Sequence, residues 1–156
     1  MSQDHEEIIK SALDRMQVLC SKSEKCSGDI EEKLKIYSLN DNERTGIIES
    51  LKKDKFIDDK RYSKFYCRDK FKFNQWGKIK IQQALKIKGI DTGIIEESLS
   101  LINEDIYYKV ILDLAYEKNK TLKEKNIYSR KGKLFRFLGS KGFESDLIYK
   151  AIDEIL

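Results

Sequence analysis

The sequence contains no proline, although a chain of 156 residues would carry about eight at average usage. Because proline interrupts helices, its absence favours a chain that is helical throughout. Histidine occurs only as His5 and no Cys-x-x-Cys pair exists, which disfavours both a zinc site and histidine general-base catalysis. Cys20, Cys26 and Cys67 are odd in number and lack a framework spacing, so we expect reduced thiols in a cytosolic protein.

Long apolar runs are missing as well. No stretch approaches the roughly 20 apolar residues that span a bilayer, and the acidic start at residues 1–7 does not resemble a signal peptide. No Gly-x-x-x-x-Gly-Lys-Ser/Thr loop occurs that would bind nucleotide phosphates. We therefore expect a cytoplasmic protein that does not contact a membrane. We expect it not to be an enzyme and to have no catalytic residues, no metal and no cofactor.

What the chain does contain is an internal repeat. Arg44–Leu51 reads Arg-Thr-Gly-Ile-Ile-Glu-Ser-Leu and recurs as Asp-Thr-Gly-Ile-Ile-Glu-Glu-Ser-Leu at 91–99, with a fainter copy at 145–152. Internal repetition in a helical chain is typical of stacked units, which present a long surface to a large partner. We therefore look for function in a surface and not in a pocket.

The repeat is anchored on three leucines, each followed five residues later by an apolar residue. In the second copy the residue before that is Gly89, and in the third it is Gly142, which predicts helix ends in the left-handed conformation. The first copy has Ser38 instead, so its helix stop is weaker. The anchors lie about 50 residues apart, enough for three helices. These anchors are Leu34, Leu85 and Leu138, followed by Leu39, Ile90 and Phe143.

The apolar spacing predicts nine helices. We place them at about 4–20, 21–37, 41–54, 58–73, 75–88, 91–102, 104–119, 129–141 and 144–156. Ser21 and Glu24 match a capping box for the second helix, and Thr92 and Ser145 match N-caps of the sixth and ninth. Residues 78–81 alternate as a strand would, but helix-forming residues follow and a strand would have no partner. Residues 117–128 are the best candidate for a mobile loop.

Charge is segregated along the chain, although the net charge is only +4. Residues 58–89 carry 10 basic and 3 acidic side chains, a net of +7, and residues 117–142 carry 9 and 2, also +7. Between them, residues 90–116 carry 1 basic and 6 acidic side chains, a net of −5. Two basic blocks at equivalent repeat positions indicate a polyanion or an acidic protein groove as partner. The alternative is that lysine-rich helix faces only keep the protein soluble.

Two features in the first basic block allow more than one interpretation. The adjacent acids Asp58 and Asp59 match a metal-dependent nuclease, but an acid at a helix start more often accepts backbone N–H bonds, and we favour that role. Aromatic residues interleave with cations along 61–80, so rings there either stack on bases or belong to the core. We favour the core for Phe65. Trp76, beside Gly77, stays open between the two roles.

Four sequence elements occur together in this chain: Phe56-Ile57-Asp58-Asp59-Lys60-Arg61-Tyr62, Trp76-Gly77-x-x-x-Ile81-x-x-x-Leu85-x-x-x-Gly89-Ile90, Ser21-x-x-Glu24 with Lys33-Leu34, and Lys133-Leu134-Phe135-Arg136-Phe137-Leu138 with Lys141-Gly142-Phe143. In these elements the sequence resembles the RecX family of recombination regulators. These elements cover nearly the whole chain in order. The chain departs from the family in its first unit, where Ser38-Leu39-Asn40 replaces the glycine stop.

The resemblance implies an all-α fold of three tandem three-helix repeats in an elongated, curved array, divided at 1–57, 58–103 and 104–156. It also implies that the chain binds the filament of the RecA recombinase on DNA, in its helical groove. There it would inhibit ATP hydrolysis and strand exchange, limit filament growth and so modulate recombination and DNA repair. We expect a monomer.

The basic blocks supply the candidate contacts with the filament or with its single- or double-stranded DNA. These candidates are Arg68, Lys70, Lys72, Trp76, Lys78, Lys80, Lys86, Lys88, Arg130, Lys131, Lys133, Arg136 and Lys141. Asp58, Asp59, Arg61 and Tyr62 form the structural family motif. A second hypothesis is an independent DNA-binding module of helix-turn-helix type. A third is a metal nuclease that uses Asp58 and Asp59.

Overall fold

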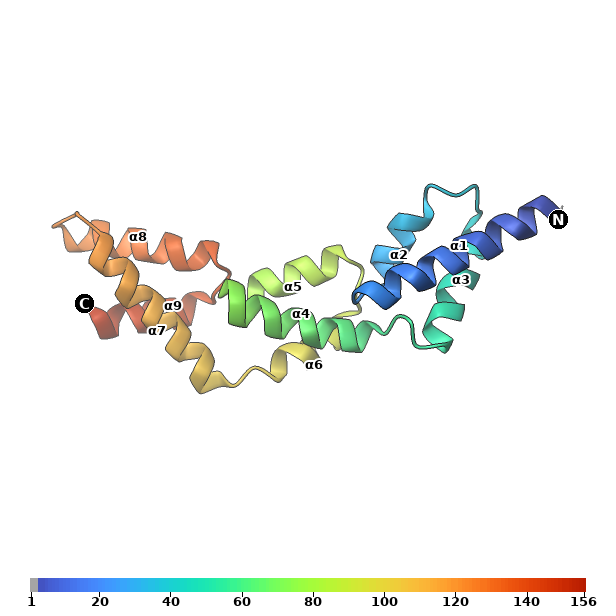
Figure 1. Cartoon of the computed structure of the whole chain (residues 1–156). Coiled ribbons are helices and arrows are strands. Elements are labelled where there is room, and N and C mark those ends of the chain that lie inside the picture. Colours follow the sequence, from blue (N-terminus) through green and yellow to red (C-terminus); the bar gives the residue numbers. More distant parts are fainter. Residues whose placement is uncertain (1–2) are drawn as a thin grey trace. The chain divides into compact units, whose positions relative to one another are not determined.

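The computed structural model describes residues 3–156, which form nine helices and no strand (Figure 1). The helices are α1 (Gln3–Lys22), α2 (Ser27–Leu34), α3 (Asp41–Lys53), α4 (Asp59–Asn74), α5 (Lys78–Ile87), α6 (Thr92–Ser100), α7 (Glu104–Thr121), α8 (Ile127–Ser140) and α9 (Ser145–Ile155). The expected all-α repeat array is confirmed, and residues 78–81 are helical. In this part of the chain, no helix has the length and apolar character needed to cross a membrane.

The helix stops predicted from glycine form as expected. Gly89 has a φ of 81°, and the N–H of Ile90 donates to the carbonyl of Leu85 at 3.1 Å, which satisfies a terminal carbonyl of α5. Gly142, with a φ of 92°, ends α8 in the same way. The three anchor leucines, Leu34, Leu85 and Leu138, are completely buried. The leucines that recur in the sequence therefore also recur as buried core residues of the three modules.

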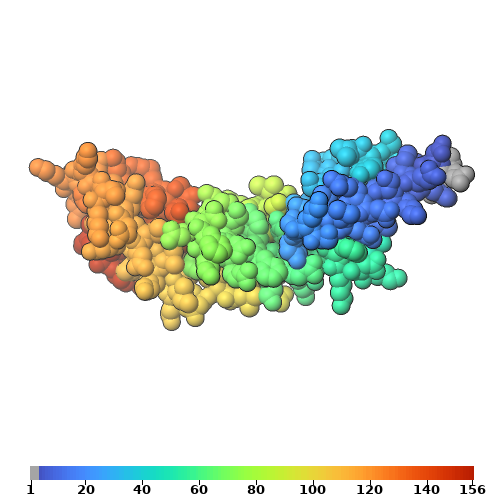
Figure 2. Space-filling model, viewed as in Figure 1, coloured from blue at the N-terminus to red at the C-terminus, as the bar shows by residue number. Residues whose placement is uncertain are grey.

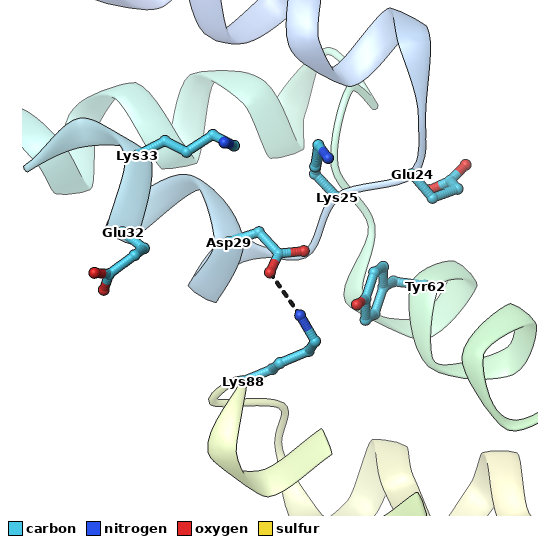
Figure 3. A pocket seen from close by; sticks show the side chains of 7 residues that line it. All are labelled: Glu24, Lys25, Asp29, Glu32, Lys33, Tyr62 and Lys88. Atoms are coloured by element: carbon cyan, nitrogen blue, oxygen red, sulfur yellow. Dashed lines mark hydrogen bonds and ion pairs between the residues drawn. The ribbon is translucent and has the colours of Figure 1, made fainter. Parts of the chain in front are cut away.

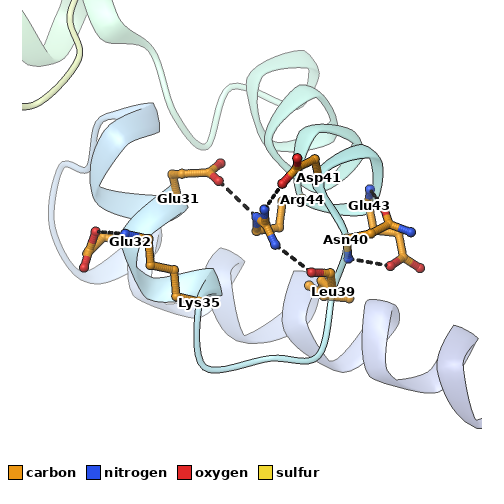
Figure 4. Close-up of polar contacts among 8 residues, drawn as sticks. All are labelled: Glu31, Glu32, Lys35, Leu39, Asn40, Asp41, Glu43 and Arg44. Carbon is orange, nitrogen blue, oxygen red and sulfur yellow. Dashed lines mark hydrogen bonds and ion pairs between the residues drawn. The ribbon is translucent and has the colours of Figure 1, made fainter.

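The first module ends its second helix without glycine. The N–H of Leu39 donates to the carbonyl of Tyr37, two residues back, at 2.9 Å. In the other two modules the corresponding N–H donates to the anchor leucine, five residues back. Arg44 then holds the connection: its guanidinium donates to the carbonyl of Leu39 at 2.6 Å, pairs with Glu31 at 3.0 Å and contacts Asp41 (Figure 4). A charged clamp from α3 thus stabilises the turn that glycine stabilises elsewhere.

The predicted start of α2 is wrong. Ser21 still belongs to α1, which continues to Lys22, and its hydroxyl donates to the carbonyl of Val18 at 2.7 Å. The capping box forms five residues later, between Cys26 and Asp29. A contact from distant sequence fixes this start, because Asp59 of α4 accepts hydrogen bonds from the backbone N–H and the hydroxyl of Ser27 at 2.9 and 2.6 Å.

Three further expectations differ from the structure. Thr92 is the first residue of α6 and not its cap, because the carboxylate of Asp91 accepts the N–H of Gly93 at 3.0 Å. Ser145 likewise opens α9, and Glu144 occupies the cap position without a side-chain cap bond. The loop expected at 117–128 is shorter, because α7 continues to Thr121.

By its internal contacts the chain divides into two compact units. The N-terminal unit holds the chain up to Lys64 together with Leu85–Ile95, and the C-terminal unit holds Phe65–Ala84 with Glu96–Leu156. The first has a core centred on Met16, Ile30 and Leu51, and the second a core centred on Tyr107, Ile111 and Leu138. The module boundaries after residues 57 and 103 stay a prediction.

Candidate partner interface

In the C-terminal unit, the start of α5 is bound by the turn that follows α8. The N–H of Gly77 donates to the carbonyl of Lys141 at 2.7 Å, and the N–H of Ile79 donates to the carbonyl of Gly142 at 3.0 Å. The first N–H groups of a helix have no partner within the helix. The second and third modules are therefore joined by backbone hydrogen bonds that cap α5.

Tyr107 of α7 completes this joint. Its buried hydroxyl accepts the N–H of Lys78 at 2.9 Å and donates to the carboxylate of Glu144. Its ring packs between Phe71 and Phe143, with ring centres 5.5 and 5.6 Å away. Burial, and then the bond to Glu144, raise the pKa of the Tyr107 hydroxyl well above its ordinary value. The hydroxyl is thus a neutral hydrogen-bonding link between the modules.

This joint brings the two basic blocks together. The ammonium group of Lys141, from the second block, donates to the carbonyl of Asn74 at 3.2 Å, at the end of α4. Figure 2 shows the red-orange residues after α8 directly against the green turn between α4 and α5. A cation at the end of α4 is also favoured by the negative end of the helix dipole. A lysine of the second block therefore binds the end of α4, 67 residues away in sequence.

Trp76 lies at the centre of this turn. The ammonium groups of Lys70 and Lys80 lie 4.8 and 4.6 Å from the centre of its ring, within the range of cation–π attraction. The side chain is half-buried, so it is neither a core residue nor an open platform for bases. We call Lys70, Trp76, Lys80 and Lys141 the Trp76 cluster.

Most of the predicted cations lack an acidic partner. Among residues 3–156, no carboxylate oxygen lies within 4.0 Å of the side-chain nitrogens of Lys70, Lys72, Lys78, Lys80, Lys86, Arg130, Lys131, Arg136 and Lys141. Their positive charge is not neutralised by an ion pair within that distance, which is what an anionic partner requires. Arg68 differs, because it pairs with Asp69 at 3.4 Å and lies 4.8 Å from the ring of Phe65. The expectation that Phe65 is a core residue is wrong, since 39% of it is exposed.

Lys88 has a partner inside the N-terminal unit. Its ammonium group donates to Asp29 at 2.9 Å and lies 5.8 Å from the ring of Tyr62, in a cavity of about 360 Å³ (Figure 3). The bond to Asp29 raises the pKa of Lys88 above its ordinary value. Burial opposes ionisation of Asp29, but hydrogen bonds from Lys88 and Cys26 outweigh it and lower the pKa of Asp29. Burial raises the pKa of Tyr62 to about 12.

Two candidates of the second block also have internal roles. Arg130 donates to the carbonyls of Asn119, Leu122 and Glu124 at 2.8, 3.3 and 2.6 Å, so it holds the connection between α7 and α8. Lys133 pairs with the carboxylate of Glu124 in the same connection. Because Lys88, Arg130 and Lys133 support the fold, the function proposed below does not depend on them.

Three residues of the family motif, Asp58, Asp59 and Arg61, also make contacts that support the fold. Asp58 accepts the N–H of Arg61 at 3.1 Å and so caps α4, as expected of an acid at a helix start. Asp59 binds Ser27 at the start of α2, and Arg61 pairs with Glu24 at 2.8 Å. The carboxylate of Asp58 thus caps one helix, and that of Asp59 links α4 to α2. No group of three metal-binding side chains occurs within the described residues.

Sequence reasoning missed Gly28 and Tyr107, which make the joints. A β-carbon on Gly28 would fall inside 3.0 Å of the Lys88 carbonyl oxygen, as close as Gly77 comes to Gly142. One signal was available. Tyr107 follows the cap residue Asn103 by four positions, as buried Tyr62 follows Asp58 in the preceding module.

Comparison with known families agrees with this architecture. The family model for the second three-helix domain of RecX matches residues 58–99, and the model for the third matches residues 104–152. Together the two matches cover more than half of the chain, from α4 to α9. The chain belongs to the RecX family.

Relatives of the RecX family match the first module as well. The chain is 31% identical over 140 residues to "Regulatory protein RecX" of Clostridium beijerinckii and 34% identical over 134 residues to that of Clostridium botulinum. These alignments cover 88% and 85% of the chain but 65% and 62% of the relatives, so the chain spans just under two thirds of their length. The crystal structure of RecX from Lactobacillus salivarius has the same fold, with a TM-score of 0.87 at 24% identity over 96% of this chain and 97% of that one.

Proposed function

We propose that this chain is a non-enzymatic, monomeric regulator that acts in the cytoplasm, where it binds the RecA recombinase filament and inhibits ATP hydrolysis and strand exchange. Family membership supports this function, since the family regulates that recombinase. One observation in the structure carries the proposal further. Lysines from both basic blocks lie at the turn between α4 and α5, Lys141 on the carbonyl of Asn74 and Lys70 and Lys80 on the ring of Trp76, with no carboxylate within 4.0 Å among the described residues.

The mechanism follows from charge and from the repeat. Ammonium and guanidinium groups without acidic partners attract acidic side chains of the filament and the phosphates of its DNA. Contacts made by separate modules of one chain strengthen each other, because the first contact raises the effective concentration of the next. Lys70 and Lys80 from the second module and Lys131 and Arg136 from the third are the contacts proposed here.

A titration of the protein into a RecA ATPase assay on single-stranded DNA tests this function. Inhibition is expected from the wild-type chain. The charge-reversed variant Lys70→Glu, Lys80→Glu, Lys131→Glu, Arg136→Glu is expected to lose it while its helical circular dichroism is retained. The matched control reverses exposed cations outside the two basic blocks, Lys10→Glu and Lys53→Glu, and is expected to inhibit. Full inhibition by the folded fourfold variant would contradict the proposed surface.

The independent DNA-binding module remains the second candidate, because the same cations can neutralise phosphates. It requires affinity for bare DNA that falls with salt at a slope of about −0.9 per neutralised phosphate of duplex DNA. A DNA titration without RecA, at several salt concentrations, separates the two functions. Tight, salt-dependent binding by a chain that leaves the RecA ATPase unchanged would favour the second candidate.

A further inference from the structure

A short sequence recurs at the end of the second helix in two modules. Leu34-Lys35-Ile36 begins at the last residue of α2, and Leu85-Lys86-Ile87 forms the last three residues of α5. The leucine of each copy is completely buried, whereas Ile36 is 85% exposed and Ile87 is 88% exposed. These are the most exposed large aliphatic side chains among the described residues.

The two isoleucines occupy equivalent places. Each lies two residues beyond the buried anchor leucine of its module. The third module has Ser140 at this position. Single exposed apolar residues are common on protein surfaces and need no explanation. Two isoleucines that are exposed at the same sequence position of two modules differ from such scattered residues, because the exposure recurs with the repeat.

Both isoleucines lie in the N-terminal unit, at opposite ends of α2. The start of α2 abuts the carbonyl of Lys88, next to Ile87, since a β-carbon on Gly28 would collide with that oxygen. From Gly28 to Leu34, the last residue of α2, the helical rise is on the order of 9 Å, and Ile36 follows two residues later. The two isoleucines thus belong to one compact unit, with Ile87 near the start of α2 and Ile36 just after its end.

We propose that Ile36 and Ile87 are paired apolar contacts for a protein surface, the recombinase surface of the proposed function, on which this inference rests. Burial in an apolar socket stabilises an isoleucine, whereas a phosphodiester chain offers it no comparable gain. The lysine beside each isoleucine, Lys35 or Lys86, indicates that carboxylates border the sockets. Lys35 pairs with Glu32 in an exposed i,i+3 contact, which a partner readily replaces.

The test uses the full chain with Ile36→Ser, Ile87→Ser and the double variant in the RecA ATPase assay. Because both side chains are exposed, the unfolding midpoints are expected to match the wild type. Each single variant is expected to raise the half-inhibitory concentration about tenfold, and the double variant by roughly the product. Affinity for bare single-stranded DNA should not change. Ser140→Ala, at the equivalent place in the third module, is the matched control and should inhibit as the wild type does.

The outcomes separate the inference from the function. If the wild-type chain inhibits RecA and either single serine variant inhibits equally well, the paired contact is wrong and the proposed function stands. If the double variant loses affinity for bare DNA to the same extent, the isoleucines serve a nucleic-acid surface and the inference is overturned. If the wild-type chain does not inhibit RecA, the proposed function itself fails.

Discussion

Gly77 and Gly142 approach each other so closely that neither position has room for a side chain. A β-carbon on Gly77 would lie inside 3.0 Å of the carbonyl oxygen of Gly142, and one on Gly142 would collide with Lys80. The N–H of Gly77 donates to the carbonyl of Lys141 beside this contact. The Trp-Gly element of the family motif therefore has a physical basis: glycine lets one module's helix start dock on the next module's helix stop.

Gly77→Ala is expected to lower the free energy of unfolding by about 3 kcal/mol, because the methyl group collides with backbone and displaces the bonds that cap α5. Urea denaturation measures the loss. Gly46→Ala is the matched control. It lies within α3 with no atom near the added methyl group, so it is expected to stabilise the protein by about 0.5–1 kcal/mol. Equal stability of the two alanine variants would contradict the joint.

Tyr107→Phe tests the polar link in the same joint. The variant keeps the ring but leaves the N–H of Lys78 and the carboxylate of Glu144 without their shared partner. We expect the free energy of unfolding to fall by about 1–3 kcal/mol. Tyr128→Phe, in which the lost hydroxyl belongs to a largely exposed side chain, should change it by less than about 0.5 kcal/mol. A neutral result at Tyr107 would show that the hydroxyl does not hold the modules together.

The ion pair between Asp29 and Lys88 predicts a dependence of stability on pH. A carboxyl group whose pKa is lower in the folded state stabilises the protein above its unfolded pKa, about 3.9, and this stabilisation is lost as pH falls through the folded value. The raised pKa of Lys88 acts in the opposite direction, so its contribution persists below about pH 10 and is lost above.

Asp29→Asn is therefore expected to destabilise the protein at pH 7 by about 1–2 kcal/mol and to flatten the loss of stability between about pH 5 and 3. Glu43 and Glu124 also have lowered pKa values, so some dependence on acid remains. Thermal unfolding across this range measures the effect, with the exposed Asp14→Asn as control. Identical pH profiles for wild type and Asp29→Asn would exclude a stabilising pair.

Trp76 is expected to act by positioning cations. Trp76→Phe keeps an aromatic ring for Lys70 and Lys80 and should inhibit RecA within about twofold of the wild type, whereas Trp76→Leu should weaken inhibition about fivefold to tenfold. Phe73→Leu is the control, an exposed ring beside Lys72 outside the cluster. Trp76 is the only tryptophan, so strong quenching of its fluorescence by bare single-stranded DNA would instead indicate stacking on bases.

The repeat was predictable because its signals are local. Leu85, Gly89 and Ile90 lie within six consecutive residues, and their roles as anchor, left-handed stop and returning apolar residue require only backbone geometry. The start of α2 was not predictable in this way. Local preference ranks Ser21 above Cys26 as a cap, but bonds from Asp59 and Lys88, which lie beyond the first module in sequence, decide the position.

The candidate interface likewise has features that local sequence predicts and features that depend on contacts between distant residues. Sequence by itself determined an all-α repeat with two basic blocks, because periodicity, glycine and charge are properties of neighbouring residues. Only the tertiary structure decided that the Lys141 ammonium group reaches the carbonyl of Asn74, beside the turn where Lys70 and Lys80 lie against the ring of Trp76. It also decided that Lys88 and Arg130 bind groups of the protein itself. The reason is that a cation's availability depends on which carboxylates and carbonyls reach it, and those partners come from distant parts of the chain.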